Sequence, residues 1–152
     1  MDFSAVFASL PIHVILPEKQ QQLRDELEAI HDPHERLGAV VDRARRRPSF
    51  PGSERIDANR VRGCVSAVWL IGELRNGRCY FRSDADGPVV KGLVALLCDF
   101  FSEATPAEIA ASTSDPIETL DLTKNLSPTR RNGLASALAA IRVFAQESLP
   151  KN

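Results

Sequence analysis

Long apolar runs, a strong net charge and a basic leader are all missing from the sequence. No apolar run is long enough to span a bilayer, and the net charge of −1 gives no overall basic field that would attract nucleic acid. The N-terminus is moderately apolar, but it opens with Asp2 and has no basic residue, so we do not expect a secretory signal. These absences argue against a membrane protein, a nucleic-acid-binding protein and an exported protein.

The cysteines are few, and their number and spacing do not indicate a disulfide framework. The chain has three, an odd number without a Cys-x-x-Cys motif, and no histidine lies at zinc-ligand spacing from any of them. They are Cys64, Cys79 and Cys98. A disulfide scaffold and a zinc site are therefore not expected, and a reducing cytosol fits this usage best.

Length and composition are those of one globular domain. With 152 residues, of which 43% are hydrophobic and 26% charged, the chain can bury a core without staples. Residues 1–17 contain Pro11 and end in Pro17, which predicts an appended N-terminal extension. Residues 18–149 are predicted to form a single domain, which we expect to be monomeric and cytoplasmic.

Two helices are predicted at the start of this domain. Apolar residues at spacings of four and three indicate a helix from about Glu18, and Asp32–Pro33 supplies an N-cap and a first-turn proline for the second helix. The second helix ends in an arginine-rich run at 43–47, which we interpret as a solvated helix end, because cations suit that end of the dipole. Residues 48–59 are predicted to be an irregular loop.

A β-hairpin is predicted in the middle of the chain. Asn76–Gly77 lies between strand-like runs at residues 67–75 and 78–82. A two-residue turn sets the register of the ladder: Arg75 with Arg78, Leu74 with Cys79, Glu73 with Tyr80 and Gly72 with Phe81. Alternation then places one apolar set on a single face: Val68, Leu70, Leu74, Cys79 and Phe81. Cys79 is therefore predicted to lie in the core.

Further helices are predicted after the hairpin. Residues 83–88 read as a turn that opens a helix to about Ser102, and this helix is apolar nearly all round, so it should be buried, with Cys98 in the core. Gly92 in its interior costs roughly 1 kcal/mol of helix propensity against alanine, so we expect another backbone to approach it closely. Two short segments and the last long helix are predicted to start at three cap–proline pairs: Thr105–Pro106, Asp115–Pro116 and Ser127–Pro128.

Arg130 lies in the first turn of the last helix, where the dipole disfavours positive charge and a capping box would place Glu or Gln. One interpretation is that it pairs with a surface acid, at a cost of a few tenths of a kcal/mol to about 1 kcal/mol. The other is that it points at an anion, with Asp84 or a thiolate at Cys64 as the candidates.

Cys64 follows a glycine and lies just behind two arginines, Arg60 and Arg62. Positive charge nearby lowers the pKa of a thiol, and Gly63 permits a turn that presents the sulfur at a loop tip. The alternative is that Cys64 is a small buried hydrophobe, as most free cysteines are.

Histidines are poorly placed to act as a base for this thiol. A cysteine hydrolase or transferase normally needs a positioned histidine, but all the histidines belong to the N-terminal part of the chain: His13, His31 and His34. A thiolate made by its surroundings can accept a group from a donor and pass it on, which favours relay chemistry. A Cys/His-dependent enzyme that uses His31 or His34 is the alternative.

Three motifs resemble those of the SufE/CsdE family of sulfur-acceptor proteins. Residues 59–69, Asn-Arg-Val-Arg-Gly-Cys-Val-Ser-Ala-Val-Trp, look like that family's cysteine motif. Residues 83–93 resemble its second signature and residues 126–134 its third, in the same order and spacing, and the similarity extends from about residue 18 to 147. The resemblance implies an α+β fold with a small antiparallel sheet backed by helices, of the SufE/NifU-like kind.

The resemblance also implies a function. A protein of this kind takes persulfide sulfur from a pyridoxal-phosphate cysteine desulfurase, stimulates the desulfurase, and feeds an iron–sulfur scaffold or another sulfur pathway. Carried over by motif, the acceptor is Cys64, and Asp84 and Arg130 match family positions near the acceptor loop. It implies no cofactor and no independent catalysis. No set of cysteines resembles the cluster ligands of an iron–sulfur scaffold, so we do not expect bound iron. Val65 stands where the family often has Gln, so we expect one polar contact near the sulfur to be missing.

An interaction module that binds and activates a desulfurase without transferring sulfur is an alternative to the relay. A persulfide is easily lost to solvent, so we also hypothesise that Cys64 rests against the apolar sheet face and swings out when a partner docks.

Overall fold

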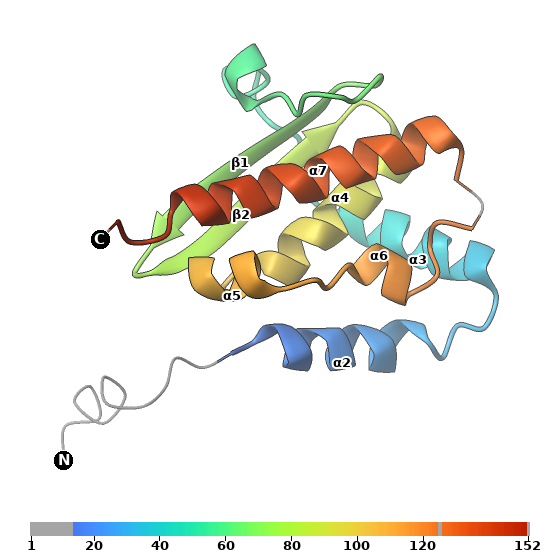
Figure 1. Cartoon of the computed structure of the whole chain (residues 1–152). Helices are drawn as coiled ribbons and strands as arrows, with labels where there is room; N and C mark the ends of the chain where they lie inside the picture. Colours follow the sequence, from blue (N-terminus) through green and yellow to red (C-terminus); the bar gives the residue numbers. More distant parts are fainter. Residues whose placement is uncertain (1–13, 125, 152) are drawn as a thin grey trace.

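The structure, a computed structural model, describes residues 14–124 and 126–151. It is an α+β fold in which a two-stranded antiparallel sheet is covered on one face by the long helices α4 and α7, while α2 and α3 pack on the far side of α4 (Figure 1). In chain order the elements are α2 (Leu16–Leu27), α3 (Pro33–Arg45), the 3-10 turn η1 (Asp57–Asn59), β1 (Val68–Arg75), β2 (Arg78–Ala85), α4 (Pro88–Phe101), α5 (Pro106–Ala111), α6 (Pro116–Thr119) and α7 (Pro128–Glu147).

Four helix starts confirm the predicted cap–proline pairs. In each, the cap side chain accepts a hydrogen bond from a backbone N–H two or three residues further on, and proline occupies the first turn, where its missing N–H is no loss. The caps are Asp32, Thr105, Asp115 and Ser127. The arginine-rich end of α3 is solvated as predicted, with Arg43 and Arg45 in exposed ion pairs.

The first helix begins earlier than predicted. It starts at Leu16, because Pro17 occupies the first turn of α2 and does not end the segment before it. Leu16 is only 3% exposed, and its N–H donates to Glu108 Oε1 at 2.7 Å. Residues 1–13 of the predicted extension lie outside the described residues, so the extent of the extension stays a prediction.

The hairpin has the predicted register, from Arg75 opposite Arg78 to Gly72 opposite Phe81. Asn76 and Gly77 both have positive φ (51° and 77°), as a two-residue hairpin turn requires. The second strand, however, continues to Ala85, so the prediction that Ser83 and Asp84 lie in a turn is wrong. The ladder continues because Val68–Leu70 of β1 still offers partners to these residues.

The predicted apolar face of the hairpin is the one under the helices. Cys79 and Phe81 are buried there, and Phe81 meets Phe144 of α7 edge to face with ring centroids 5.4 Å apart. Helix α7 can lie this close because Gly72 has no side chain: a Cβ there would be 2.7 Å from the Phe144 ring. Leu74 is the exception, 48% exposed beside the turn at the end of the hairpin.

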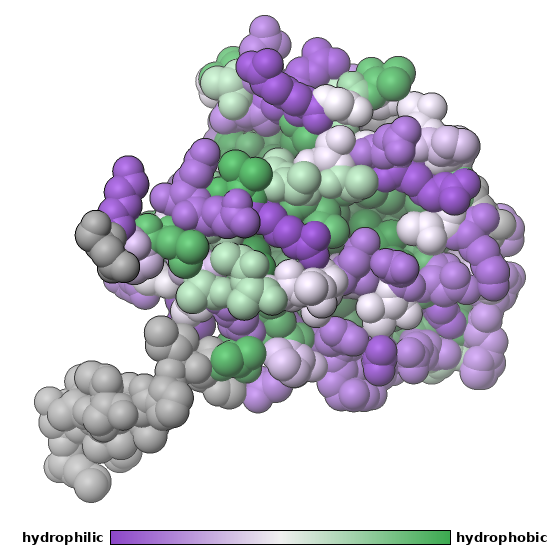
Figure 2. Space-filling model, in the orientation of Figure 1, coloured by the Kyte–Doolittle hydropathy of each residue, from purple (hydrophilic) through white to green (hydrophobic). Residues whose placement is uncertain are grey.

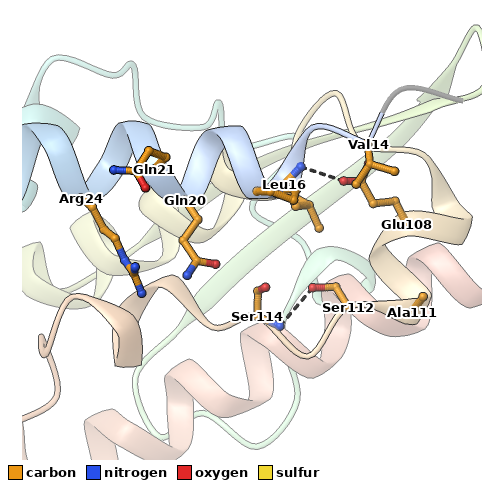
Figure 3. Close-up of a pocket in the computed structure, with 10 residues that line it drawn as sticks. Val14, Leu16, Gln20, Gln21, Arg24, Glu108, Ala111, Ser112 and Ser114 are labelled. Carbon is orange, nitrogen blue, oxygen red and sulfur yellow. Dashed lines mark hydrogen bonds between the residues drawn. The ribbon is translucent and has the colours of Figure 1, made fainter.

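Helix α4 is the predicted central helix. Cys98 is fully buried in it, and a Cβ on Gly92 would lie 2.9 Å from the Val41 Cα, which confirms the close approach of another backbone, that of α3. A pocket of about 450 Å³ lies between the start of α2 and the end of α5, where Glu108 accepts the Leu16 N–H (Figure 3). None of its lining residues belongs to the segment around Cys64.

Candidate functional site

Cys64 lies on a short loop that is closed at its base. The Val61 N–H donates to the Val68 carbonyl at 2.8 Å, and Arg60 forms an antiparallel bridge with Trp69, so residues 62–67 leave and rejoin the end of the sheet at one place. Gly63 has a φ of 88°, the left-handed region that favours glycine. At the other end of the loop the Ala67 carbonyl accepts from the Asp86 N–H at 3.1 Å, so both ends of the loop are hydrogen-bonded to the body of the domain.

Helix α7 provides the seat of the Cys64 side chain. The thiol donates to the Gly133 carbonyl, with Sγ 3.5 Å from the oxygen, and a Cβ on Gly133 would also be 3.5 Å from Sγ. Ser136 lies one turn on, with its Oγ 2.8 Å from where a Cβ on Gly63 would stand. Small residues of α7 thus contact the loop, and Cys64 rests against this helix and the core cluster beneath it. The predicted outward movement of Cys64 stays a hypothesis.

The seated thiol is half-buried and is not electrostatically activated. Burial raises the pKa of Cys64, and the nearby charge of Arg60, which lowers it, does not compensate. The expectation that flanking arginines make a thiolate is therefore wrong for the resting position, because the cost of desolvating the anion is the larger effect. Next to Cys64, Val65 is 81% exposed at the loop tip.

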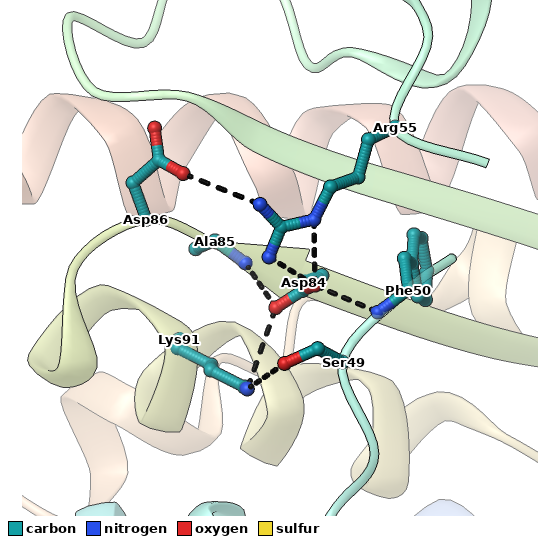
Figure 4. A network of polar contacts seen from close by, with 7 residues as sticks. All are labelled: Ser49, Phe50, Arg55, Asp84, Ala85, Asp86 and Lys91. Atoms are coloured by element: carbon teal, nitrogen blue, oxygen red, sulfur yellow. Dashed lines mark hydrogen bonds and ion pairs between the residues drawn. The ribbon is translucent and has the colours of Figure 1, made fainter. Parts of the chain in front are cut away.

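Asp84 is a fully buried carboxylate with a complete set of partners (Figure 4). It accepts from the Phe50 N–H at 2.8 Å, from the Ala85 N–H at 2.9 Å and from Arg55 Nη2 at 2.8 Å, and Lys91 Nζ lies 3.5 Å away. Burial by itself would raise the pKa of Asp84, but these hydrogen bonds and the Lys91 charge hold it below the ordinary value. Asp84 has no hydrogen bond to Cys64. Its hydrogen bonds to Phe50 and Arg55 join the loop between α3 and η1 to the end of β2.

Arg55 links Asp84 to the first strand, because it also contacts Trp69 of β1. Its guanidinium, 4.8 Å from the centre of the Trp69 ring, lies over the strand residue that faces Asp84 in the ladder. Sequence reasoning missed Arg55, because 29 residues separate it from Asp84 and no local pattern marks it. It also missed Gly133 as the partner of Cys64, although the Asn132–Gly133 pair lies in the third motif.

Arg130 does not point at Asp84, contrary to one of the two predicted targets. Its backbone N–H donates to the Ser127 cap at 3.2 Å, while its exposed guanidinium makes no hydrogen bond or ion pair with any residue in 14–124 or 126–151. Arg130 lies three residues before Gly133, so both lie on one side of α7, the side that receives Cys64.

Neither described histidine serves Cys64. His31 and His34 are exposed near the start of α3, and neither contributes to the shifted pKa of the thiol; His13 lies outside the described residues. Cys79 and Cys98 are fully buried as predicted, and burial raises the pKa of Cys98 to about 12. Within the described ranges there is no group of three or more residues that could hold a metal ion, and no helix long and apolar enough to cross a membrane.

Known proteins resemble this chain in sequence and in fold. The SufE family model, an Fe-S metabolism associated domain, matches residues 21–145. The chain belongs to the SufE family. An uncharacterised SufE-like protein of Synechocystis sp. is 33% identical over 131 residues, covering 86% of this chain and 82% of that protein. Membership gives the chain an accessory, sulfur-related role in Fe–S metabolism.

Two other similarities extend this comparison. The chloroplastic quinolinate synthase of Arabidopsis thaliana is 33% identical over 109 residues, which is 71% of this chain but only 15% of that protein. A hypothetical protein from Thermus thermophilus, solved in solution, has a TM-score of 0.69 at 17% identity and covers 86% of this chain and 95% of its own. The second similarity shows the fold alone and confirms the predicted α+β class.

Proposed function

We propose that this SufE-family protein accepts sulfur on Cys64 from the persulfide of a cysteine desulfurase and passes it to a downstream acceptor, such as an Fe–S scaffold. The observation that carries the proposal is the position of Cys64. Its thiol is half-buried on a loop with an exposed tip, and the loop is closed at its base by the Val61–Val68 hydrogen bond. Such a loop can shelter a sulfur atom and deliver it without unfolding the sheet.

The transfer is a thiol–persulfide exchange. The Cys64 thiolate attacks the terminal sulfur of the desulfurase persulfide, a new S–S bond forms on Cys64, and the desulfurase cysteine leaves as a thiolate. No external oxidant or reductant is needed, because the sulfur moves at constant oxidation level. The rate of such an exchange depends on the thiolate fraction and on access to the sulfur.

The resting seat holds Cys64 back from this reaction. Burial against α7 raises the pKa of the thiol, so leaving the seat removes the main obstacle to ionisation while Arg60, at the base of the loop, still favours the thiolate. We propose that docking of the desulfurase moves residues 62–67 outward. Arg130, exposed and without a described partner on the same side of α7, would then face the anionic sulfur.

Asp84 supports the site indirectly in this proposal. Its bonds to Phe50 and Arg55 fix the loop that leads into the Cys64 segment, so it is a positioning residue. The protein itself needs no cofactor for the exchange; pyridoxal phosphate belongs to the desulfurase, which makes the persulfide.

The proposal is tested by measuring how fast the desulfurase produces sulfide in the presence of a reductant. The rate with the wild-type protein is compared with the rate with the Cys64→Ser variant. The desulfurase is incubated with its cofactor, cysteine and either form of the protein. We expect the wild type to accelerate sulfide release and Cys64→Ser to abolish the acceleration. Equal acceleration by the two forms would overturn the relay and favour an activating interaction module.

A further inference from the structure

The arginines without partners gather around the Cys64 loop. All arginines of the chain lie within the described ranges, and most of their side chains make an ion pair or hydrogen bond there. The guanidinium groups with neither, to any residue in those ranges, are those of Arg46, Arg60, Arg62, Arg130 and Arg131. Four of these five belong to the Cys64 segment or to the first turn of the helix that seats it. These four arginines, here called the cationic rim, form no ion pair with an acidic residue in the described ranges.

An apolar groove runs from this rim along the outside of β1. It has a volume of about 390 Å³ and lies between the loop that carries Arg60 and Arg62 and the outward side of α7. Leu70 of β1 lies between those two walls, and Ala139, Ala140 and Val143 line the α7 wall. Figure 2 shows this face, with green and pale residues recessed between the segment at the top and the helix across the middle, and purple residues around them.

Small residues on α7 keep this groove open. The core-facing side of α7 carries the larger residues Leu134, Leu138 and Ile141. The outward side carries alanines instead, and Ala139 is exposed. Val143 is 48% exposed at the far end. The charged residues among those that line the groove are Arg60 and Arg62, both exposed. An apolar groove with cations on one wall and no acid among its lining residues suits an apolar segment that also carries carboxylates.

We propose that this groove, here called the α7 groove, binds a short acidic and apolar segment of the cysteine desulfurase. The apolar side chains of that segment pack on Leu70 and α7. Its carboxylates pair with Arg60 and, while Cys64 is in its seat, also with Arg62. This inference rests on the proposed function. The desulfurase is the occupant to which the geometry points, because the groove is continuous with the base of the loop that must leave its seat when the desulfurase docks.

The groove separates binding from transfer. Arg60 lies at the β-bridge to Trp69, below the movable residues 62–67, so its position is kept when Cys64 leaves its seat. A partner held at Arg60 and on the α7 wall can therefore remain bound through both the outward and the seated positions of Cys64. Affinity then depends on the groove, whereas sulfur transfer depends on Cys64 and on the Arg60 charge that favours its thiolate.

The test measures affinity and transfer separately with the full-length chain and the pyridoxal-phosphate-loaded desulfurase. Dissociation constants are determined by calorimetry between about 0.05 M and about 0.5 M NaCl, where screening of exposed charges increases steeply. The variants are Arg60→Gln/Arg62→Gln, which removes the charged wall, and Ala140→Trp, which fills the groove. Arg46→Gln is the matched control, since Arg46 also lacks a described partner but lies at the end of α3. Sulfur on Cys64 is followed by mass spectrometry at saturating desulfurase.

We expect the double variant to bind about 5- to 20-fold more weakly at low salt and to approach the wild type at high salt. Ala140→Trp should bind at least about tenfold more weakly at every salt concentration, and Arg46→Gln should match the wild type. At saturation Cys64 should still acquire sulfur in the double variant, but more slowly, because Arg60 also favours the thiolate. If both groove variants bind like Arg46→Gln while wild-type Cys64 acquires sulfur, the groove proposal is overturned and the relay stands.

The opposite failure is distinguishable. Weakened binding by the groove variants without any sulfur on wild-type Cys64 would retain the groove and overturn the relay. Absence of binding by the wild-type protein itself would overturn both. Far-ultraviolet circular dichroism and thermal unfolding of each variant establish that a loss of affinity is not a loss of fold.

Discussion

Replacing Asp84 with asparagine tests whether this carboxylate holds the Cys64 loop in place. Asparagine keeps the size and one acceptor oxygen but turns the other oxygen into an NH₂ donor. Oδ2 accepts from Phe50 and Arg55 and Oδ1 from Ala85, so the new NH₂ group faces a donor in either orientation of the amide. Removing one partner of a buried ion pair costs about 3–5 kcal/mol. The Arg55 and Lys91 side chains are 34% and 22% exposed and can regain water, so we expect a somewhat smaller loss, about 2–4 kcal/mol.

The assay is urea denaturation at pH 7 of the wild type, Asp84→Asn and Asp86→Asn. Asp86 is the matched control: its carboxylate is 58% exposed and lies 3.7 Å from Arg55, so its loss should cost less than about 1 kcal/mol. Against a total stability of roughly 5–15 kcal/mol, the Asp84 variant should remain folded. Its Cys64 thiol should also react faster with a thiol reagent, because the segment that leads to the loop is less firmly tied.

The pH dependence of this effect has a definite sign. The folded state lowers the pKa of Asp84, so its stabilisation is present above the unfolded-state value of about 3.9 and is lost as pH falls through the lower folded-state value. The stability difference between the wild type and Asp84→Asn should therefore be constant near neutral pH and shrink in acid. A loss below about 1 kcal/mol at pH 7, equal to that of Asp86→Asn, would refute the reasoning.

Three further substitutions test individual contacts. Gly92→Ala should lower the free energy of unfolding by about 1–3 kcal/mol, because the new Cβ would lie 2.9 Å from a backbone atom of α3. Gly38→Ala, with no atom within 4 Å of its Cβ, should raise this free energy by up to about 1 kcal/mol. A change of the same sign for both variants in urea denaturation would contradict this packing. Gly63→Ala should lower unfolding free energy by about 1–2 kcal/mol through its φ of 88° and speed labelling of Cys64, and unchanged labelling would argue against the seat on α7. Arg60→Gln should raise the pKa of Cys64, seen as a shift of the thiol-labelling profile to higher pH, and an unchanged profile would exclude Arg60 as the charge that favours the thiolate.

Local chemistry made much of the fold predictable. The Asn76–Gly77 turn set the hairpin register because both residues tolerate positive φ, and the cap–proline pairs marked four helix starts because those residues satisfy or lack the free N–H groups of a first turn. The same reasoning misplaced Ser83–Asp84. Serine and aspartate are typical of caps, but here the strand ladder and the contact of Asp84 with Arg55 outweigh that preference.

The site was less predictable because its contacts are distant in sequence. Cys64 and Gly133 are 69 residues apart, so neither spacing nor periodicity links the thiol to its seat on α7. The flanking arginines suggested a thiolate, but only the structure shows that burial outweighs the charge of Arg60. Arg130 was identified by its unfavourable place at a helix start; its surroundings, including the lack of a described partner, needed the fold.

Transfer of labelled sulfur to Cys64 tests the central claim most directly. The desulfurase is first loaded with sulfur from isotopically labelled cysteine and freed of excess substrate, then mixed with this protein for a single turnover. Intact-mass measurement and peptide mapping locate the label, with Cys79 and Cys98 as internal controls that are fully buried. The account predicts one labelled sulfur on Cys64, removable by reductant, and none on the other two cysteines. Label that stays on the desulfurase, under conditions where the two proteins bind, would contradict it.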